Sequence, residues 1–301
     1  MEKGKDFTIE EKHKRVKEFR PIDDAFFEVL ANDIDFCQEM LRILLDDEKL
    51  IVEDVIVQSS ERNIYGRSVR LDALCFLKRY GKCNVEVQRS GSDDHLRRVR
   101  FNASSIAVKD SQTKQRFKDI EDIIVVYILE FDIFKGNRAI YHVDSVIRET
   151  GEKVDDGLER VFVNTQVRDE TTVSEYLSCL IEKEVNNSKF PVLTKRMNYL
   201  KHQEGGLQAV CEVMEKYEKK AAEEANIRAI KKMIIDFNGN HNKTYTIKKD
   251  GDNNNEFDFI IKNIGNGFGK DVKLYLEPKG YEFLNDEENM KIINSSFLEY
   301  K

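Results

Sequence analysis

The sequence predicts an α/β fold, and three features of the central part of the chain support this. The run Ile123–Leu129 is apolar at every position, which is typical of a central strand covered on both faces. Two strand-like runs, Val69–Leu77 and Cys83–Gln88, are separated by a Lys/Arg/Gly turn, which predicts a hairpin. The segment 92–108 has the period of an amphipathic helix, and we expect it to be the crossover to the Ile123–Leu129 strand.

The residues before the hairpin predict a tail, a helix and a strand. Residues 1–18 are charged throughout and are interpreted as a solvated, disordered tail, although their basic side chains could also contact a phosphate backbone. After Pro21, the pair Asp23-Asp24 precedes an amphipathic run, and Asp24 is a good N-cap for that helix. The run Val52–Gln58 is predicted to be the first strand.

The residues after the central strand predict further strands and two helices. Strands are expected near residues 139–147 and 160–164. Thr172 and Glu175 form a plausible capping box for a helix over residues 173–184. A long helix is predicted over residues 207–237. Its strongly polar middle suggests that it projects from the core or packs against a second copy of the chain.

The composition changes near Gly239, where Asn, Gly and Asp punctuate runs of alternating polarity. This pattern predicts a small antiparallel β unit. One stretch of it, residues 259–276, resembles a hairpin of immunoglobulin-like modules, but the remaining chain is too short for a full seven-stranded sandwich. The expected organisation is therefore a tail (1–18), a main domain (19–204), a helical arm (205–237) and a β-rich unit (238–301), whose ligand the sequence does not indicate.

Asp72 and Glu86 are the residues that point most directly to chemistry. Side chains alternate along a strand, so Glu86 and Gln88 share one face, while Cys83, Val85 and Val87 take the other. A hairpin centred on Arg79 puts Asp72 opposite Glu86, and one centred on Tyr80 puts it opposite Gln88. Either register brings two carboxylates together. Such a pair repels unless a hard divalent cation binds it, although a merely solvated polar face is the alternative.

Composition excludes several classes of protein. The formal net charge of −7 argues against a protein that coats nucleic acid non-specifically. No apolar run approaches the roughly 20 residues of a membrane span, and the first residues lack a hydrophobic signal, so we expect a cytoplasmic protein with no membrane partner. The five scattered cysteines predict reduced, mostly buried thiols. His95 is expected at the surface.

Six stretches of sequence, taken in order, resemble the PD-(D/E)xK nuclease family transposases, also described as recombination-promoting nucleases. The resemblance runs from about residue 19 to about residue 237 and rests on residues 20–30, 40–45, 66–74, 84–90, 156–164 and 204–216. It implies a restriction-endonuclease-like core, in which helices flank a central mixed sheet. It also implies hydrolysis of DNA phosphodiester bonds with Mg²⁺ or Mn²⁺, in recombination or mobile-element movement, with DNA as partner and a homodimer through the helical arm as a further possibility.

The resemblance assigns roles to the residues of the hairpin. Asp72 and Glu86 correspond to the metal ligands, and the backbone carbonyl of Val87 to a third oxygen ligand. Gln88 stands where the wider superfamily usually has a lysine, and it would orient the attacking water. Superfamily members often bring a further carboxylate from a first helix, a role that Asp24 or Glu28 could take.

A neutral Gln88 leaves the site in need of a positive group. The predicted helix over residues 92–108 offers Arg97, Arg98 and Arg100, with Ser92 or Asp93 as N-cap and an apolar stripe of Leu96, Val99, Ala103 and Ile106. These arginines either contact DNA phosphates or form a solvated face. Relatives usually carry Tyr-His after the arginine pair, where this chain has Phe101-Asn102. A catalytically silent nuclease fold that binds nucleic acid or protein, with the β unit as interaction surface, is therefore the alternative function.

Overall fold

The computed structural model describes residues 8–61, 69–91 and 94–236 and three strands beyond them. The chain divides into two compact units, which we describe separately. The first comprises Thr8–Glu218, and the second comprises the remaining residues at the two ends of the chain. Among the helices described, none combines the length and the apolarity that a membrane crossing needs.

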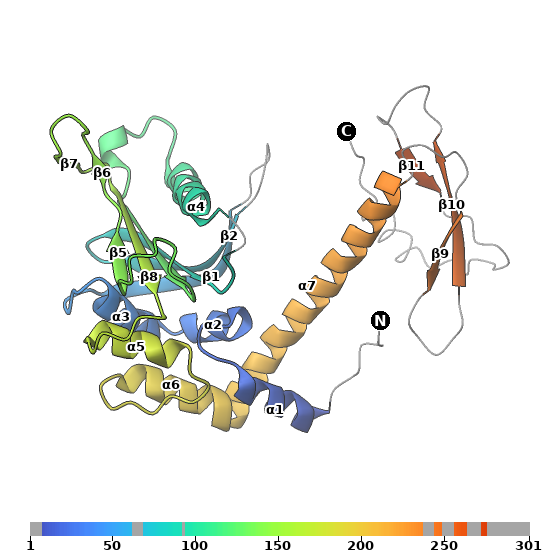
Figure 1. Ribbon diagram of the computed structural model, residues 1–301, viewed down its shortest axis with the longest axis horizontal. Helices are drawn as coiled ribbons and strands as arrows, with labels where there is room; N and C mark the ends of the chain where they lie inside the picture. The colour runs from blue at the N-terminus through green and yellow to red at the C-terminus, as the bar shows by residue number, and fades with distance from the viewer. Residues whose placement is uncertain are drawn as a thin grey trace. The chain divides into compact units, whose positions relative to one another are not determined.

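A six-stranded mixed sheet forms the centre of the first unit (Figure 1). The central strands β3, β4 and β8 run parallel, and the outer neighbours β2, β1 and β5 pair antiparallel. The predicted α/β class and mixed sheet are confirmed. In spatial order the strands are β1 (Val52–Glu61), β2 (Val69–Leu77), β3 (Gly81–Gln88), β4 (Ile123–Leu129), β8 (Leu158–Asn164) and β5 (Ile140–His142).

The strand expected near residues 139–147 is wrong in one respect, because it is interrupted. β5 ends at His142, and Ser145–Val146 forms a separate strand, β6, which pairs with β7 (Lys153–Val154) in a two-stranded sheet. A short 3₁₀ helix, η1 (Phe117–Asp119), precedes β4.

Helices cover both faces of the central sheet (Figure 1). The alternation of β4 shows the two layers: Ile124, Val126 and Ile128 belong to the larger core, and Val125 and Tyr127 to the smaller one. All seven residues of β4 are buried, as its apolar sequence predicts. The larger core also contains residues of α2 (Asp24–Ala31), α3 (Ile34–Leu44), α5 (Thr172–Leu180) and α6 (Pro191–His202). The smaller core contains α4 (His95–Asp110), which connects the parallel strands β3 and β4 as expected.

Two helix boundaries differ from the sequence prediction. Helix α5 begins one residue earlier, because the side chain of Thr171, and not that of Thr172, accepts the backbone N–H of Ser174. It also ends at Leu180 instead of Glu184.

Helix α6 was not predicted from the sequence. The cysteines agree with expectation, since all five are buried free thiols.

The expectation of a solvated tail is wrong for its second half, which forms helix α1 (Ile9–Glu18). Thr8 and Glu11 form a capping box, and Val16 is fully buried. The buried ammonium group of Lys201 donates to the carbonyls of Lys17 (2.8 Å) and Phe19 (2.6 Å) at the end of α1. These groups have no partner within the helix, so Lys201 attaches α1 to α6. Residues 1–7 lie outside the described residues.

Helix α7 (Glu204–Asp236) begins in the first unit and continues into the second. Its residues Leu207, Val210 and Met214 are buried, the first two within the larger core. The prediction that the polar segment 215–226 leaves the core is wrong for its first residues, because Glu215 and Glu218 form ion pairs with α1. Packing of α7 against a second copy stays a prediction.

The second unit contains a three-stranded antiparallel sheet in the order β11-β10-β9, which confirms the predicted small β unit. Its strands are Thr244–Lys248 (β9), Glu256–Asn263 (β10) and Val272–Tyr275 (β11). The likeness to an immunoglobulin-like hairpin stays a prediction.

Candidate functional site

Strands β2 and β3 separate at Asp72 and Glu86, and the candidate site forms there. The pairs from Leu77–Gly81 to Ala73–Val85 are those of a hairpin centred on Arg79, so the register that places Asp72 opposite Glu86 is the correct one. Beyond the last pair, side chains replace main-chain partners. Asp72 Oδ2 accepts the N–H of Val87 at 3.1 Å, and Glu86 Oε1 accepts the N–H of Asp72 at 3.4 Å.

The turn of this hairpin requires glycine. Gly81 has φ 71°, and a Cβ at this position would clash with the backbone carbonyl of Asp122. Because a shift of one residue would move every side chain of β3 to the other face, this turn helps to bring Glu86 to the site and Val85 to the core.

The neighbouring strand β1 is strained beside Asp72. The register of β1 and β2 runs through Val57–Ala73 and Ser59–Leu71, so Gln58 lies across from Asp72. Gln58 has φ 53°, a left-handed conformation that is rare for a residue with a side chain and rarer still within a strand. Gln58 and Asp72 do not form a pair in the β1–β2 ladder, so the positive φ of Gln58 lies where the regular pairing beside Asp72 is interrupted.

Glu86 and Asp72 carry raised pKa values. Glu86 is fully buried, and burial, followed by the negative charge of Asp72, raises the pKa of its carboxyl to about 8. Burial, and then the charge of Asp24, raises the pKa of Asp72 to about 6. The amide of Asn84 donates to Glu86 Oε1 at 3.2 Å, and Asn84 is itself buried. Sequence reasoning missed Asn84, although its position two residues before Glu86 places it on the same face.

Arg98 of α4 compensates part of this negative charge. Its guanidinium donates to Gln88 Oε1 at 2.8 Å and lies 3.3 Å from Glu86 Oε2, so one side chain joins the two residues that alternate along β3. The prediction that Glu86 and Gln88 share a face is therefore confirmed. Arg98 also lowers the pKa of both Glu86 and Asp72 against the larger effect of burial.

The other two arginines of α4 point elsewhere. Arg97 forms an ion pair with Asp94, and its side chain is 78% exposed, while Arg100 is exposed as well. The N-cap is Asp94, which accepts the N–H of Arg97, so the expectation of Ser92 or Asp93 as N-cap is wrong. Val99, Ala103 and Ile106 are buried as predicted.

Leu96, the fourth residue of the predicted stripe, does not fit it, because it is 48% exposed. It precedes Val99 by three residues and therefore lies about 60° from it around the helix axis, at the margin of the buried face. Of the two residues that replace the family's Tyr-His, Phe101 is exposed and Asn102 is buried.

Helix α2 contains the two candidates for a further acidic group, Asp24 and Glu28, and Asp24 is the one whose charge affects the site. Asp24 is the first helical residue and Asp23 is the N-cap, so the capping role expected of Asp24 is wrong. The charge of Asp24 raises the pKa of Asp72. Glu28 is instead committed to an ion pair with Lys216 of α7 at 2.8 Å. Asp24 is therefore the better candidate for a further acidic group.

The expectation that His95 lies at the surface is wrong. Its side chain is buried, its Nδ1 lies 3.0 Å from the Tyr127 hydroxyl, and its ring packs against Phe131. Tyr127 stands beside Glu86 in the parallel ladder of β3 and β4. A histidine in the first turn of a charged helix has no sequence signal that distinguishes this buried position from an exposed one.

The donor set fits a hard divalent ion bound by two carboxylates, which is a common arrangement for Mg²⁺. The raised pKa values show that the two carboxyl groups resist being charged together, and Arg98 offsets this only in part. The Gln88 carbonyl accepts the N–H of Glu130, the residue that follows β4, and carbonyls alternate along a strand, so the carbonyl of Val87 points toward β2 and Asp72. Among the described residues, no group of three or more His, Cys, Asp or Glu side chains is close enough to hold a metal.

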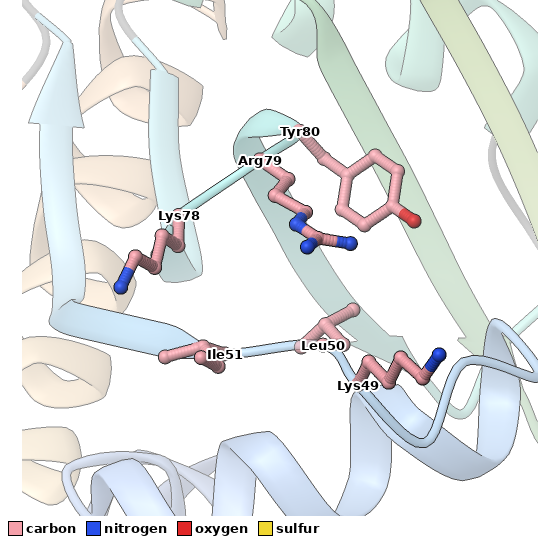
Figure 2. A pocket seen from close by; sticks show the side chains of 6 residues that line it. All are labelled: Lys49, Leu50, Ile51, Lys78, Arg79 and Tyr80. Atoms are coloured by element: carbon pink, nitrogen blue, oxygen red, sulfur yellow. The ribbon is translucent and has the colours of Figure 1, made fainter.

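A separate cavity of about 110 Å³ lies at the opposite end of the hairpin. Figure 2 shows the turn residues Arg79 and Tyr80 facing the segment Lys49–Ile51 across it. The Tyr80 hydroxyl donates to Asp47 at 2.8 Å. Neither carboxylate of the site lines this cavity, so it forms no part of the candidate site.

One comparison with known proteins identifies the family. The family model of the PD-(D/E)XK nuclease family transposase matches residues 27–248. No curated protein and no solved structure matches the chain. The match begins within α2, includes the β2–β3 hairpin with both carboxylates, and continues through α7 into β9. The chain therefore belongs to the PD-(D/E)XK nuclease family transposases.

Proposed function

We propose that this protein is a divalent-metal-dependent DNA endonuclease, which hydrolyses phosphodiester bonds in recombination or mobile-element movement. The observation that carries the proposal is the junction of β2 and β3. There the ladder opens, and the carboxylates of Asp72 and Glu86 converge beside Gln88 and Arg98. Membership of a nuclease family supports the reaction class.

Asp72, Glu86 and the backbone carbonyl of Val87 would hold Mg²⁺ or Mn²⁺, with Asp24 as a further acidic group. A bound divalent ion supplies Lewis-acid stabilisation of phosphate charge and makes a bound water more acidic. The folded chain supports this role because it keeps two carboxylates together at a cost that a cation would remove.

Gln88 and Arg98 together would take the role of the lysine that other members of the superfamily usually have at the position of Gln88. The Gln88 amide can orient a water or a phosphate oxygen, but it carries no charge. Arg98 supplies the charge, because its guanidinium already contacts both Gln88 and Glu86 and could shift to an oxygen of the phosphate as negative charge develops. Arg97 and Arg100 are left to contact the DNA backbone outside the site.

A second candidate function is a catalytically silent nuclease fold that binds nucleic acid or protein. The observation that favours it is the same Arg98–Glu86 pair, because a fixed guanidinium can neutralise the carboxylate without any metal. The replacement of Tyr-His by Phe101-Asn102 agrees with this candidate.

Supercoiled-plasmid nicking separates the two functions. We expect nicking with Mg²⁺ or Mn²⁺, none with EDTA, and a loss of at least about a hundredfold in Asp72→Asn and Glu86→Gln. Asp156→Asn changes an exposed acid just before β8, at the opposite end of the parallel strands from Glu86, and serves as the matched control. Circular dichroism should be unchanged in all three variants. Absence of metal-dependent nicking by the wild type, or wild-type rates in both site variants, would favour the silent fold.

A further inference from the structure

The first half of α7 contacts the α2–β2 side of the candidate site. Lys216 Nζ lies 2.8 Å from Glu28 Oε1, and Arg70 Nη2 lies 4.0 Å from Glu28 Oε2. Glu28 follows Asp24 by four residues, so the two acids share a face of α2. Arg70 precedes Asp72 by two residues on β2. Three elements that are distant in sequence therefore meet at Glu28.

Tyr217 is the aromatic residue at this meeting point. The Arg70 guanidinium lies over its ring, 5.9 Å from the centroid. Burial, followed by the charges of Glu28, Asp72 and Asp24, raises the pKa of the Tyr217 hydroxyl. The hydroxyl is thus within electrostatic range of the site carboxylates. It also keeps its proton at neutral pH and is available as a hydrogen-bond donor.

The three charged residues that meet at Glu28 carry one net positive charge, which counters part of the negative charge of Asp24 and Asp72 nearby. The single carboxylate of Glu28 is shared by two cations, Arg70 and Lys216. The Lys216 side chain is 54% exposed, so its ammonium group can turn to a ligand while Arg70 stays with Glu28. A cationic side chain together with a phenolic donor suits a phosphate oxygen.

We infer that Tyr217 and Lys216 of α7, held in place by Arg70 and Glu28, form a phosphate-binding subsite beside Asp72. Its ligand would be a backbone phosphate of the nucleic-acid strand next to the bond that is cut. The inference rests on the proposed function for its substrate, and it extends that function by assigning part of the DNA contact to the long helix. Tyr217 would also bring an aromatic hydroxyl to a site that lacks one at position 101.

The competing explanation is that these residues only fasten α7 to the core. In that case Tyr217→Phe, which keeps the ring and its contact with Arg70, should leave DNA binding unchanged. A phosphate contact predicts that the same variant binds DNA more weakly. Tyr199→Phe is the matched control, because the Tyr199 ring also contacts an arginine, Arg196, with 5.4 Å between guanidinium and centroid.

Binding is measured by fluorescence anisotropy with a labelled DNA oligonucleotide, as single strand and as duplex, in EDTA so that no cleavage occurs. We expect Tyr217→Phe to weaken binding about tenfold and Tyr199→Phe to leave it unchanged. Lys216→Gln should lower the slope of log K against log salt by about 0.9 for duplex and about 0.7 for single strand. Lys189→Gln, which breaks the Lys189–Glu175 ion pair, should leave the salt slope unchanged for both forms of DNA.

The possible results distinguish failure of the subsite proposal from failure of the proposed nuclease function. Wild-type affinity and salt slope in both α7 variants would overturn the subsite, whether or not the protein cuts DNA. Weaker binding by both variants supports it even if the plasmid assay shows no nicking. A wild type that binds neither form of DNA would overturn the subsite and the proposed substrate together.

Discussion

Arg98 Nη2 lies 3.3 Å from Glu86 Oε2, so a charge from helix α4 compensates a carboxylate that strand β3 buries completely. A buried carboxylate of this kind destabilises the fold when its partner is removed. The relationship also links two residues that lie 12 positions apart in the chain. Several expected outcomes depend on it.

The first prediction concerns Arg98 itself. Arg98→Met should lower the free energy of unfolding by about 1–3 kcal/mol, less than for a fully enclosed pair because Arg98 is 34% exposed and Glu86 can take up a proton. Arg97→Met is the control and should change it by less than about 0.5 kcal/mol, since Arg97 is exposed. Urea unfolding at neutral pH measures both. Equal losses would mean that the Arg98–Glu86 contact does not stabilise the fold.

The second prediction concerns pH. The Glu86 carboxyl has a pKa of about 8 when folded, against 4.5 for an ordinary glutamate, so the native state binds the proton more tightly. Stability from this group is therefore complete below about pH 4.5 and is lost as the pH rises through 8. The metal-free protein should lose up to about 1.4 kcal/mol per pH unit across this window.

Urea unfolding from pH 5.5 to 8.5 in EDTA measures this slope. Glu86→Gln should flatten it, whereas Glu182→Gln, a change at an exposed position, should leave it as in the wild type. A slope that is unchanged in Glu86→Gln would show that another group causes the pH dependence.

The third prediction concerns metal binding. Mg²⁺ or Mn²⁺ should raise the melting temperature, because an ion at ten times its Kd stabilises the native state by about 1.4 kcal/mol. Asp72→Asn should stabilise the metal-free protein, because it removes a carboxylate whose charged form burial disfavours, and it should abolish most of the metal response. Differential scanning fluorimetry at constant ionic strength tests both effects. Identical shifts in the two proteins, or none up to tens of millimolar, would rule out the metal site.

The fourth prediction concerns α7. A chain that ends after residue 237 should fold and keep whatever nuclease activity the full chain has, because Asp72, Glu86, Arg98 and Tyr217 all lie in the Thr8–Glu218 unit. A chain that ends after His202 should not fold, since it lacks Leu207, Val210 and Met214, each of which contributes about 1.5–3 kcal/mol by burial. Circular dichroism and plasmid nicking compare them. A folded shorter chain would show that α7 is dispensable to the core.

The fifth prediction concerns the strained residue beside Asp72. Gln58→Gly should stabilise the protein by about 0.5–1 kcal/mol, because glycine adopts φ 53° without strain. The same change at Ile56, a neighbour on β1 without positive φ, should destabilise it by a similar amount. Thermal unfolding measures the two signs. Destabilisation by both would mean that the conformation of Gln58 is not strained.

Much of the framework was predictable from local sequence. The apolar run of β4, the alternation of β3 and the composition change near Gly239 each depend on neighbours within a few residues, and each prediction is confirmed. Period two also placed Glu86 and Gln88 on one face. Local rules were less reliable at boundaries, where Asp94 and Thr171 proved to be the N-caps, because several adjacent polar residues can accept the same N–H groups.

The sequence by itself determined the two carboxylates, their shared hairpin and the class of fold, because a strand's alternation and a turn's geometry are local properties. Only the tertiary structure decided which cation reaches Glu86, that His95 is buried against Tyr127, and that Lys216 and Tyr217 of a distant helix lie at the edge of the site. These outcomes depend on how helices pack on a sheet. That packing is set by the combined burial of many side chains, so the sequence near each of these residues contains no pattern that predicts it.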